Sequence, residues 1–416
     1  MACSAAFGTL ACKPPQAVAC SATDHRKQFG MNFELSDEQQ QLADSVRKYL
    51  AIHYGFEQRK AIIGSARGHS EAVWRALAEM GIAAIALPEA DGGFGGGALD
   101  LMPVMEACGE ALVVEPVAES IVAGRLVART GDAAQRAALL PGLVDGSAAL
   151  ALAYLEPGRR YAHAPQDTVA RRAGLGWVLD GAKSVVVGAA SATRLLVTAR
   201  TEAEAAGGAS LFVVDPQAAG VSLNPSRSMD GLRMADVGLR EVALGADALL
   251  GPAGAALPQI EEALDFATAL QCADAIGAMR YAHEATLEYT KTRKQFGTAI
   301  ASFQVLQHRM VEMLISFEQA RSMAILAAAR VDGAGDHGGG VDQRRRAVSA
   351  AKVKIADAAR LISQESVQLH GGMGMTEELK VSHSFRRLAM VAQRLGDADH
   401  HLERFAALDG APQGKP

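Results

Sequence analysis

The sequence has few aromatic residues and few cysteines, and each shortage excludes a kind of protein. Aromatic residues make up 5% of the 416 residues, so the core must be built from Ala, Leu, Val, Ile and Met, which favours packed helices. Five cysteines in a chain of this length do not form a disulfide framework. Because no Cys-x-x-Cys pair occurs either, we expect a cytoplasmic protein of a reducing compartment, without structural zinc.

Strong positive charge and long apolar runs are also missing. A formal net charge of −5 argues against a nucleic-acid partner bound by counterion release. No uncharged apolar run reaches the roughly 18 residues that a transmembrane helix needs, so no membrane partner is expected. The length exceeds one ordinary core, and we expect two or three domains.

Residues 1–30 differ from the rest of the chain. They contain Pro14-Pro15 and scattered Ala, Ser and Cys, without amphipathic periodicity. A secretory signal would need a basic start and an unbroken apolar stretch, and neither is clear. We interpret residues 1–30 as a disordered extension, or as a mis-assigned start that precedes a true start at Met31.

Three blocks follow: helical, β-rich and helical again. Residues 31–147 open with a capping box at Ser36–Gln39 and contain a later helix that Gly81 is expected to stop. Residues 148–249 contain short β-rich runs separated by turn signals, among them Trp177–Asp180 and Ser184–Val187, which we expect to be separate strands. The chain between the runs is too short for crossover helices, which favours a sandwich or barrel over a parallel Rossmann sheet. Residues 250–410 carry long apolar stripes at helical spacing. We predict an α+β fold with an N-terminal helical domain, a middle β-barrel or sandwich domain and a C-terminal four-helix bundle.

Two glycine-rich or basic segments are candidates for phosphate binding. Gly92–Gly97 precedes a helix, where free amides can hold a phosphate, but read alone the segment is better explained as a structural turn. In the segment Thr292–Gly297, Arg293 offers a planar fork suited to a diphosphate, and Phe296 can pack on a flat ring. Read alone, this segment is also a helix end with a solvated basic face.

Two further segments lie towards the end of the chain. In the segment Gln368–Thr376, paired glycines after a helix serve as a C-cap or allow a ligand to approach the backbone. His370 lacks a partner one turn away, so it is not expected to bind a metal. Gly396–His401 is open to three readings: a metal site, a catalytic carboxylate or a helix N-cap, the commonest use of such an Asp.

Taken together, these segments resemble the acyl-CoA dehydrogenase family from Met31 to about Leu408. Two C-terminal signatures carry the resemblance: Arg293-x-x-Phe296-Gly297 with Phe303-Gln304, and Gln368-Leu369-His370-Gly371-Gly372-x-Gly374. Leu87-Pro88-Glu89 with Gly92-Gly93-Phe94-Gly95 resembles the N-terminal signature. The co-occurrence of all three in the family's order is more specific than any one of them.

The resemblance implies an FAD-dependent acyl-CoA dehydrogenase whose cofactor lies between subunits. Arg293 would reach the diphosphate, and Phe296, Phe303 and Gln304 would lie at the cofactor across a dimer. The adenosine side would meet a loop that contains Gln368, Gly371 and Gly372. The implied partners are an acyl-CoA substrate, an electron-transfer flavoprotein or similar acceptor, and a like or related chain in a homo- or hetero-dimer or tetramer.

The chain departs from the family pattern around the flavin. The usual Thr-Glu-Pro-Gly-x-Gly-Ser-Asp is Leu155-Glu156-Pro157-Gly158-Arg159-Arg160-Tyr161 here, and the usual Trp-Ile-Thr is Val185-Val186-Val187. The family's glutamate base falls at Gly396, and its alternative position falls near Ala267. Asp397 is therefore the leading candidate for the base that takes the α-proton while the β-hydride passes to flavin N5, with Asp399 and Asp265 as alternatives.

The C-terminal segment also resembles the small-subunit branch of the family, as in pimeloyl-CoA and steroid acyl-CoA dehydrogenases. Some of those enzymes pair two unlike chains, one of which lacks part of the active site. Two other functions therefore stay open: a non-catalytic or half-site partner subunit of a heteromeric dehydrogenase, and a flavin oxidase acting on a thioester.

Overall fold

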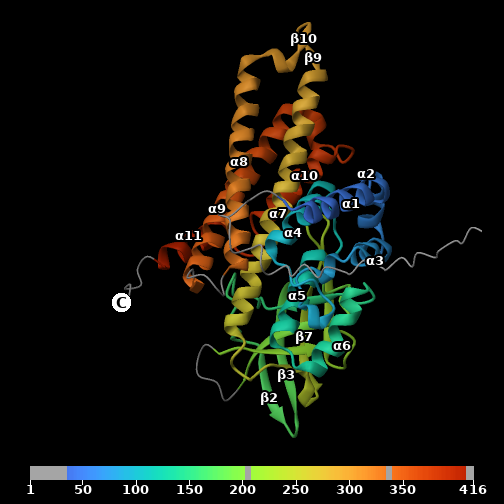
Figure 1. Ribbon diagram of the computed structural model, residues 1–416, viewed down its shortest axis with the longest axis vertical. Helices are drawn as coiled ribbons and strands as arrows, with labels where there is room; N and C mark the ends of the chain where they lie inside the picture. Colours follow the sequence, from blue (N-terminus) through green and yellow to red (C-terminus); the bar gives the residue numbers. More distant parts are fainter. Residues whose placement is uncertain (1–34, 202–207, 334–339, 409–416) are drawn as a thin grey trace, which may run out of the picture. The chain divides into compact units, whose positions relative to one another are not determined.

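The computed structural model describes residues 35–201, 208–333 and 340–408. The extension expected at residues 1–30 lies outside this range. The described residues form a helical part, a sheet and a second helical part in chain order (Figure 1). This arrangement confirms the predicted α+β fold class. Within the described residues, no helix has the length and apolar character needed to cross a membrane.

The N-terminal part begins at the predicted capping box. Ser36 Oγ accepts a hydrogen bond from the Gln39 N–H, and Gln39 Oε1 accepts one from the Ser36 N–H. A glycine with positive φ, Gly81, follows the third helix, as expected for a helix stop. The helices are α1 (Asp37–His53), α2 (Phe56–Gly64), α3 (Glu71–Glu79), α4 (Ala98–Ala111), α5 (Val117–Thr130) and α6 (Ala133–Val144).

The glycine-rich turn before α4 has a structural role, because it packs closely and its helix N-terminus binds a carboxylate of the chain itself. The N–H groups of Ala98 and Leu99 donate to the two carboxylate oxygens of Asp332, at 2.7 and 2.8 Å. A Cβ at Gly93 would lie 2.1 Å from the carbonyl oxygen of Leu87, so the turn needs glycine for close packing. The helix N-terminus that could have bound a phosphate is thus occupied by the chain's own carboxylate.

The middle part is a mixed sheet with the strand order β6-β7-β3-β2-β4-β5-β8, and β1 pairs with β4. Most pairs are antiparallel, but β1 and β2 each run parallel to β4. The sequence predicted two strands where the structure has the single irregular strand β3, and it missed β6. The strands are β1 (Leu150–Ala153), β2 (Val169–Ala173), β3 (Gly176–Val187), β4 (Arg194–Thr201), β5 (Ser210–Val214), β6 (Val221–Arg227), β7 (Arg233–Leu244) and β8 (Leu249–Leu250).

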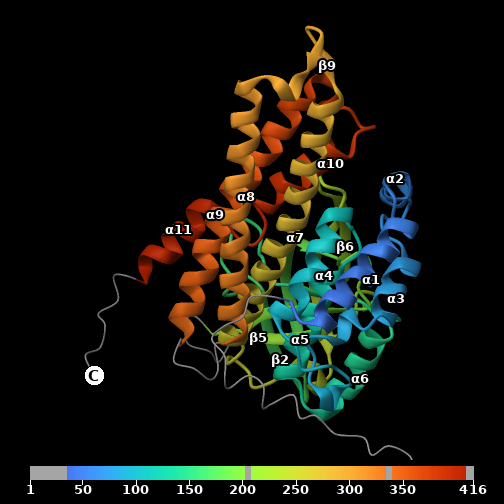
Figure 2. The same cartoon turned by 45° about the horizontal axis from the view of Figure 1, so that its top comes forward.

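The C-terminal part is a bundle of long helices that Figures 1 and 2 show running side by side. Helix α7 contacts α4 and α5 of the N-terminal part as well as α8, α9 and α10. It therefore joins the two helical parts and is buried along much of its length. The elements are α7 (Leu257–Thr292), the hairpin strands β9 (Lys294–Gln295) and β10 (Thr298–Ala299), α8 (Gln304–Asp332), α9 (Gly340–His370), α10 (Lys380–Val391) and α11 (Ala398–Ala407).

Candidate active site

The residues expected to bind the cofactor gather at one end of the bundle. The ring of Tyr289, near the end of α7, stacks on His370, at the end of α9, with 4.3 Å between centroids. This contact brings the β9–β10 hairpin and the segment after α9 to the same end. We call the following residues the bundle-end patch: Arg293, Phe296, Phe303, Gln304, Gln368, Gly371 and Gly372.

The bundle-end patch is open to solvent in the single chain. Phe296 is 92% exposed, and its ring meets Phe303 edge-on at 6.1 Å. A Cβ added at Gly371 or Gly372 would meet no atom within 4 Å, so the backbone there is free for a ligand to approach. An exposed phenylalanine of this kind is typical of a surface that another molecule covers.

A second site lies between the N-terminal helices, the sheet and α7. We call it the buried cavity because most of its lining is buried or half-buried, although exposed residues such as Arg160 and Val185 also border it. Its volume is about 470 Å³. Both segments that the resemblance places at the flavin line it, one through Leu155 and Gly158 and the other through Val185 and Val187. The other lining residues include Met105, Val113, Glu115, Val117, Ala118, Glu119, Val122, Leu152, Tyr154, Glu156, Leu232, Met390, Gln393, Arg394 and Leu395.

Helix α7 contributes one continuous face to the buried cavity. Leu264, Ala267, Gln271 and Asp274 all line it, and their spacing of three and four residues places them along one side of a helix. The face extends over ten residues, about 15 Å. Ala267, where the family carries its alternative glutamate, is at the cavity but supplies no carboxylate. The same helix reaches Arg293 at the bundle-end patch about 28 Å beyond Asp274.

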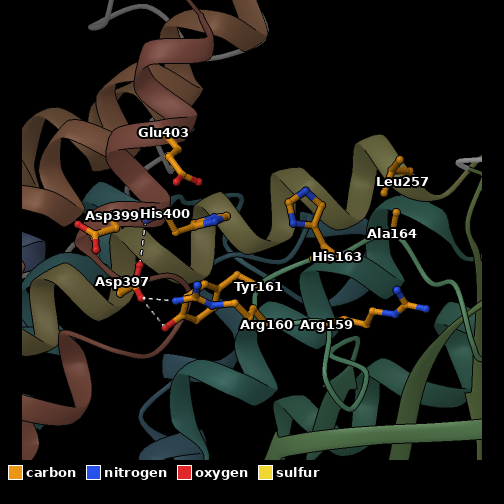
Figure 3. Close-up of a pocket in the computed structure, with 11 residues that line it drawn as sticks. Arg159, Arg160, Tyr161, His163, Ala164, Leu257, Asp397, Asp399, His400 and Glu403 are labelled. Carbon is orange, nitrogen blue, oxygen red and sulfur yellow. Dashed lines mark hydrogen bonds and ion pairs between the residues drawn. The ribbon is translucent and has the colours of Figure 1, made fainter.

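A third site is the surface pocket drawn in Figure 3. It adjoins the buried cavity, because Arg160 and Tyr161 line both. Its volume is about 580 Å³. One wall is the segment that follows Pro157, and another is the start of α11 with Asp397, Asp399 and His400. The surface pocket therefore combines the segment that departs from the family's Gly-Ser-Asp with the segment that departs from its catalytic glutamate.

Arg160 adopts an unusual backbone conformation at this junction. Its φ is +49°, a region that glycine adopts without strain and that other residues avoid. The family pattern stated above has glycine at this position, which would adopt this φ without strain, whereas here the backbone carries an arginine side chain. The Arg160 side chain is 80% exposed and lies 3.4 Å from a carboxylate oxygen of Asp397.

Asp397 caps α11, which is one of the three readings of its segment. Its Oδ1 accepts a 2.9 Å hydrogen bond from the His400 N–H, and its Oδ2 lies 3.4 Å from the Tyr161 hydroxyl. The His400 N–H, the Arg160 charge and the Tyr161 hydroxyl together lower the pKa of the Asp397 carboxyl. In this state the carboxylate is stabilised as a cap, and it borders the surface pocket rather than the buried cavity.

The two alternative aspartates have different surroundings. Asp265 is buried, and its oxygens lie 2.8 Å from Arg344 Nε and 2.7 Å from Arg404. Both oxygens are thus engaged in ion pairs. Asp399 is exposed and borders the surface pocket. Neither residue lines the buried cavity.

Sequence reasoning missed the carboxylates that do line the buried cavity. These are Glu115, Glu119, Glu156 and Asp274. Glu119 forms an ion pair with Arg394, and Asp274 with Arg387. No local motif marks them, because each pair joins positions more than a hundred residues apart. Only Glu156, inside the altered Glu-Pro-Gly segment, had a sequence signal.

The segment Arg394–Gly396, just before Asp397, is held by buried polar groups. Lys352 Nζ donates to the carbonyl oxygens of Arg394 and Gly396, at 2.8 and 2.6 Å. Burial lowers the pKa of this amine to about 8. His401 contacts the Leu395 carbonyl oxygen at 3.0 Å. These contacts hold a turn in which Leu395 and Gly396 both have positive φ.

Glu156 holds in place another wall of the buried cavity, formed by the segment around Pro157. One oxygen accepts from the Thr168 N–H at 2.9 Å and lies 3.0 Å from the buried Lys183 amine. The other accepts from the N–H groups of Gln166 and Asp167. Burial alone would raise the pKa of Glu156, but these N–H donors and Lys183 lower it to about 2. Glu156 is therefore a structural anion that shapes the wall.

Comparison with known proteins agrees with this architecture. Models of the N-terminal, middle and C-terminal domains of acyl-CoA dehydrogenases match residues 36–147, 151–242 and 257–407. The acyl-CoA dehydrogenase FadE12 of Mycobacterium tuberculosis is 33% identical over 372 residues, which span 87% of this chain and 93% of the relative.

Solved structures show the same fold. The ChsE4-ChsE5 complex from Mycobacterium tuberculosis matches with a TM-score of 0.83 and 25% identity, over 92% of this chain and 100% of the other. A steroid ACAD, Tcur3481-Tcur3483, matches with a TM-score of 0.79 and 30% identity, over 89% and 97%. The chain belongs to the acyl-CoA dehydrogenase family, whose members are oxidoreductases that use FAD to dehydrogenate acyl-CoA thioesters.

Proposed function

We propose that the chain binds FAD at a subunit interface and oxidises the α,β-bond of an acyl-CoA. The observation that carries this proposal is the buried cavity. Its walls come from the two segments expected to face the flavin, from the α7 face with Ala267, and from the turn before Asp397. These are the parts of the chain that a flavin and a thioester would have to meet together.

The residues fit FAD if two chains contribute. The bundle-end patch is exposed and lies too far along α7 to reach the buried cavity of its own chain. A second chain would bring Arg293 to the diphosphate, Phe296, Phe303 and Gln304 to the cofactor, and Gln368, Gly371 and Gly372 to the adenosine. Helix α8 also exposes apolar side chains suited to a subunit interface. They are Val305, Val311, Leu314 and Ile315.

The chemistry needs a hydride acceptor and a base. FAD, when bound, accepts the β-hydride. The chain itself supplies the carboxylate that takes the α-proton, for which Asp397 is our proposal. Its pKa is low when it caps α11 in water, and exclusion of water by the cofactor and thioester would raise it towards the range of a useful base. Asp265 is the weaker alternative because its ion pairs hold both oxygens.

Neighbouring groups can make the α-proton acidic enough to remove. The thioester carbonyl must accept hydrogen bonds as negative charge develops on its oxygen. In the turn held by Lys352, the Arg394 N–H already donates to the Met390 carbonyl oxygen, so the Leu395 N–H, whose residue lines the buried cavity, is the group that we assign to that oxygen. We propose that Lys352 preserves this geometry without touching the substrate.

A half-site partner subunit is the second candidate. It is favoured by a specific observation: Asp397, Asp399 and Asp265 all lie outside the lining of the buried cavity. A structural relative, the ChsE4-ChsE5 complex, contains two named chains. In this reading a related chain supplies the base, and this chain supplies half of each FAD site. An electron-transfer flavoprotein or similar protein would reoxidise the flavin in either case.

Purification of the chain alone tests both readings. A yellow protein that anaerobic addition of mixed acyl-CoA thioesters bleaches supports the complete enzyme. A protein that is bleached only after a co-purifying homologue is added supports the half-site subunit. A protein that binds no FAD in either preparation would contradict both proposals. Rapid reoxidation of the bleached protein by oxygen would instead favour a flavin oxidase.

A further inference from the structure

The end of the buried cavity beyond Ala267 is polar, which is unexpected for a cavity that would hold a hydrocarbon tail. Gln271 lines this end and is only 6% exposed. Neither its amide nitrogen nor its amide oxygen has a hydrogen-bond partner among the residues that the structure describes. A buried amide with both ends unsatisfied is rare in folded proteins and points to a missing partner.

The next turn of α7 continues this polar end. Asp274 lies 3.4 Å from a terminal nitrogen of Arg387, and Arg387 Nε lies 3.3 Å from an oxygen of Asp230. Arg387 Nε and that Asp230 oxygen also lack a well-directed hydrogen bond within the described structure. Gln271 is thus the first of several incompletely satisfied groups, and Asp274 and Arg387 line the cavity beside it.

The side chains that α7 places at the cavity become more polar from its N-terminal end towards its C-terminal end. Leu264 and Ala267 are apolar, and Gln271 and Asp274 follow them towards the end of the cavity. Gln271 is four residues past Ala267, about 6 Å along the helix. If the reacting carbons lie near Ala267, a saturated acyl chain would contact Gln271. It would exclude water from the Gln271 amide without offering it a hydrogen bond. Sites built to bind a polar group reject analogues that lack it for this reason.

The charges at this end disfavour an anionic group. Glu115 and Asp274 both line the cavity, and Asp230 lies behind Arg387. The guanidinium of Arg387 is already shared between Asp274 and Asp230. The buried Arg59 beside them donates to the backbone carbonyl oxygens of Leu112 and Asp230, so two engaged guanidinium groups face three carboxyl groups. A carboxylate on the substrate would add a further negative charge without a free cation. The Gln271 amide can both donate and accept, so it suits a hydroxyl or a carbonyl equally.

We propose that the acyl group of the substrate carries a neutral hydrogen-bonding group, a hydroxyl or a carbonyl, beyond its reacting carbons, and that Gln271 binds it. This proposal rests on the proposed function, since it assumes that the buried cavity holds the acyl group. It makes Gln271 a specificity-determining residue and predicts discrimination against saturated n-alkyl and ω-carboxylated acyl groups.

The test compares matched substrates on the FAD-loaded protein, with its partner chain if one is required. Hexanoyl-, octanoyl- and decanoyl-CoA are each compared with their ω-hydroxy and ω-carboxy analogues by anaerobic flavin reduction. At the best-fitting length, we expect kcat/KM for the hydroxy compound to exceed that for the other two by roughly 5- to 150-fold. Gln271→Met, which keeps the length of the side chain, should abolish this preference.

Binding supplies a second readout that does not depend on turnover. Thioether analogues of the same CoA compounds cannot form the enolate-like state, and calorimetry should show the same order of affinity. Leu264→Met, on the same face of α7, is the control and should change the affinity for hydroxy and alkyl compounds by the same factor.

The outcomes separate this proposal from the proposed function. If no acyl-CoA reduces the flavin or binds, the proposed function fails. If acyl-CoA compounds react but the alkyl compound matches the hydroxy compound, the proposed function stands and a water molecule satisfies Gln271, which overturns this inference. Preference for the ω-carboxy compound, or a preference that survives Gln271→Met, would also overturn it.

Discussion

The bundle-end patch and the buried cavity lie along the same helix, α7, but they are built in different ways. The patch comes from two short segments, around Arg293–Gln304 and Gln368–Gly372, and its side chains are mostly exposed. The cavity draws single residues from helices and strands that are far apart in the sequence. Side chains of the patch do not have to pack against the rest of the chain. Side chains of the cavity must also fill the interior and satisfy their buried charges and hydrogen bonds.

The two regions differ in electrostatics as well. Arg293 is exposed and has no ion-pair partner among the described residues. Most charged residues at the cavity are paired, as in Glu119 with Arg394 and Glu156 with Lys183, and Glu115 accepts hydrogen bonds from backbone N–H groups instead. A ligand at the patch would therefore form new ion pairs and hydrogen bonds. A ligand at the cavity would instead bind beside ion pairs that the chain has already formed.

The largest effect is expected where the cavity meets the surface pocket. Asp397→Asn should keep the fold and the yellow colour, because Asn caps a helix nearly as well as Asp. Asn cannot accept the α-proton, so the rate of flavin reduction measured by stopped-flow should fall by roughly 100-fold or more. The control Asp399→Asn removes a carboxylate from the same pocket and should change this rate little.

Two results would contradict the role of Asp397. Equal losses in both variants would indicate a shared structural role for the start of α11. An unchanged rate in Asp397→Asn, with the wild-type chain active alone, would move the base elsewhere, and Asp265→Asn would be the next variant to measure.

The patch should respond in affinity rather than in rate. Arg293→Ala removes a charge-assisted contact to the cofactor diphosphate, which is worth roughly 1.5–3 kcal/mol. The dissociation constant for FAD, measured by fluorescence, should rise by about 10- to 150-fold. Lys291→Ala, which removes an exposed cation on the last turn of α7, is the matched control. FAD affinity equal to that of wild type in Arg293→Ala would show that the assignment of Arg293 is wrong.

The same contrast explains how much could be predicted from the sequence. Capping at Ser36, the helix stop at Gly81 and the order of the three parts follow from local patterns, and the structure confirms them. The single strand β3 and the missed strand β6 show the limit of such patterns, because strand continuity depends on pairing with distant β7.

Residues of the buried cavity could not be predicted for a related reason. Gln271 and Asp274 lie in a stretch of α7, residues 266–279, whose other residues are apolar or small, and nothing nearby in the sequence distinguishes them from helix-surface residues. Their role depends on burial by α4, α5 and α10, which only the fold supplies. Asp397 was singled out from the sequence, but its pairing with Arg160 joins segments 237 residues apart.

A smaller effect is expected from the wall of the cavity. Because the folded-state pKa of Glu156 is about 2, below its ordinary value of 4.5, its charge stabilises the fold fully above pH 4.5, and this contribution is lost as the pH falls towards 2. The melting temperature of Glu156→Gln should therefore lie below that of wild type near neutral pH, and the gap should narrow across this acidic range.

Exposed Glu318 on α8 provides the comparison for this measurement. Glu318→Gln removes a carboxylate that takes no part in the wall, so its melting temperature should follow wild type at every pH. The difference in melting temperature between Glu156→Gln and wild type could instead stay constant from neutral pH down to about pH 2. That result would show that the shape and hydrogen bonds of the Glu156 side chain, rather than its charge, account for its role.

The smallest effect is expected from the first 30 residues. Every residue of the bundle-end patch, the buried cavity and the surface pocket follows Met31 in the sequence, and residues 1–30 show no core-facing pattern. A chain that starts at Met31 should therefore match the full chain in FAD content, in melting temperature and in the rate of flavin reduction. All three are measured on the two proteins side by side. A lower melting temperature with unchanged FAD affinity would assign the extension to the stability of the fold, and lost FAD with an unchanged melting temperature would assign it to the cofactor site.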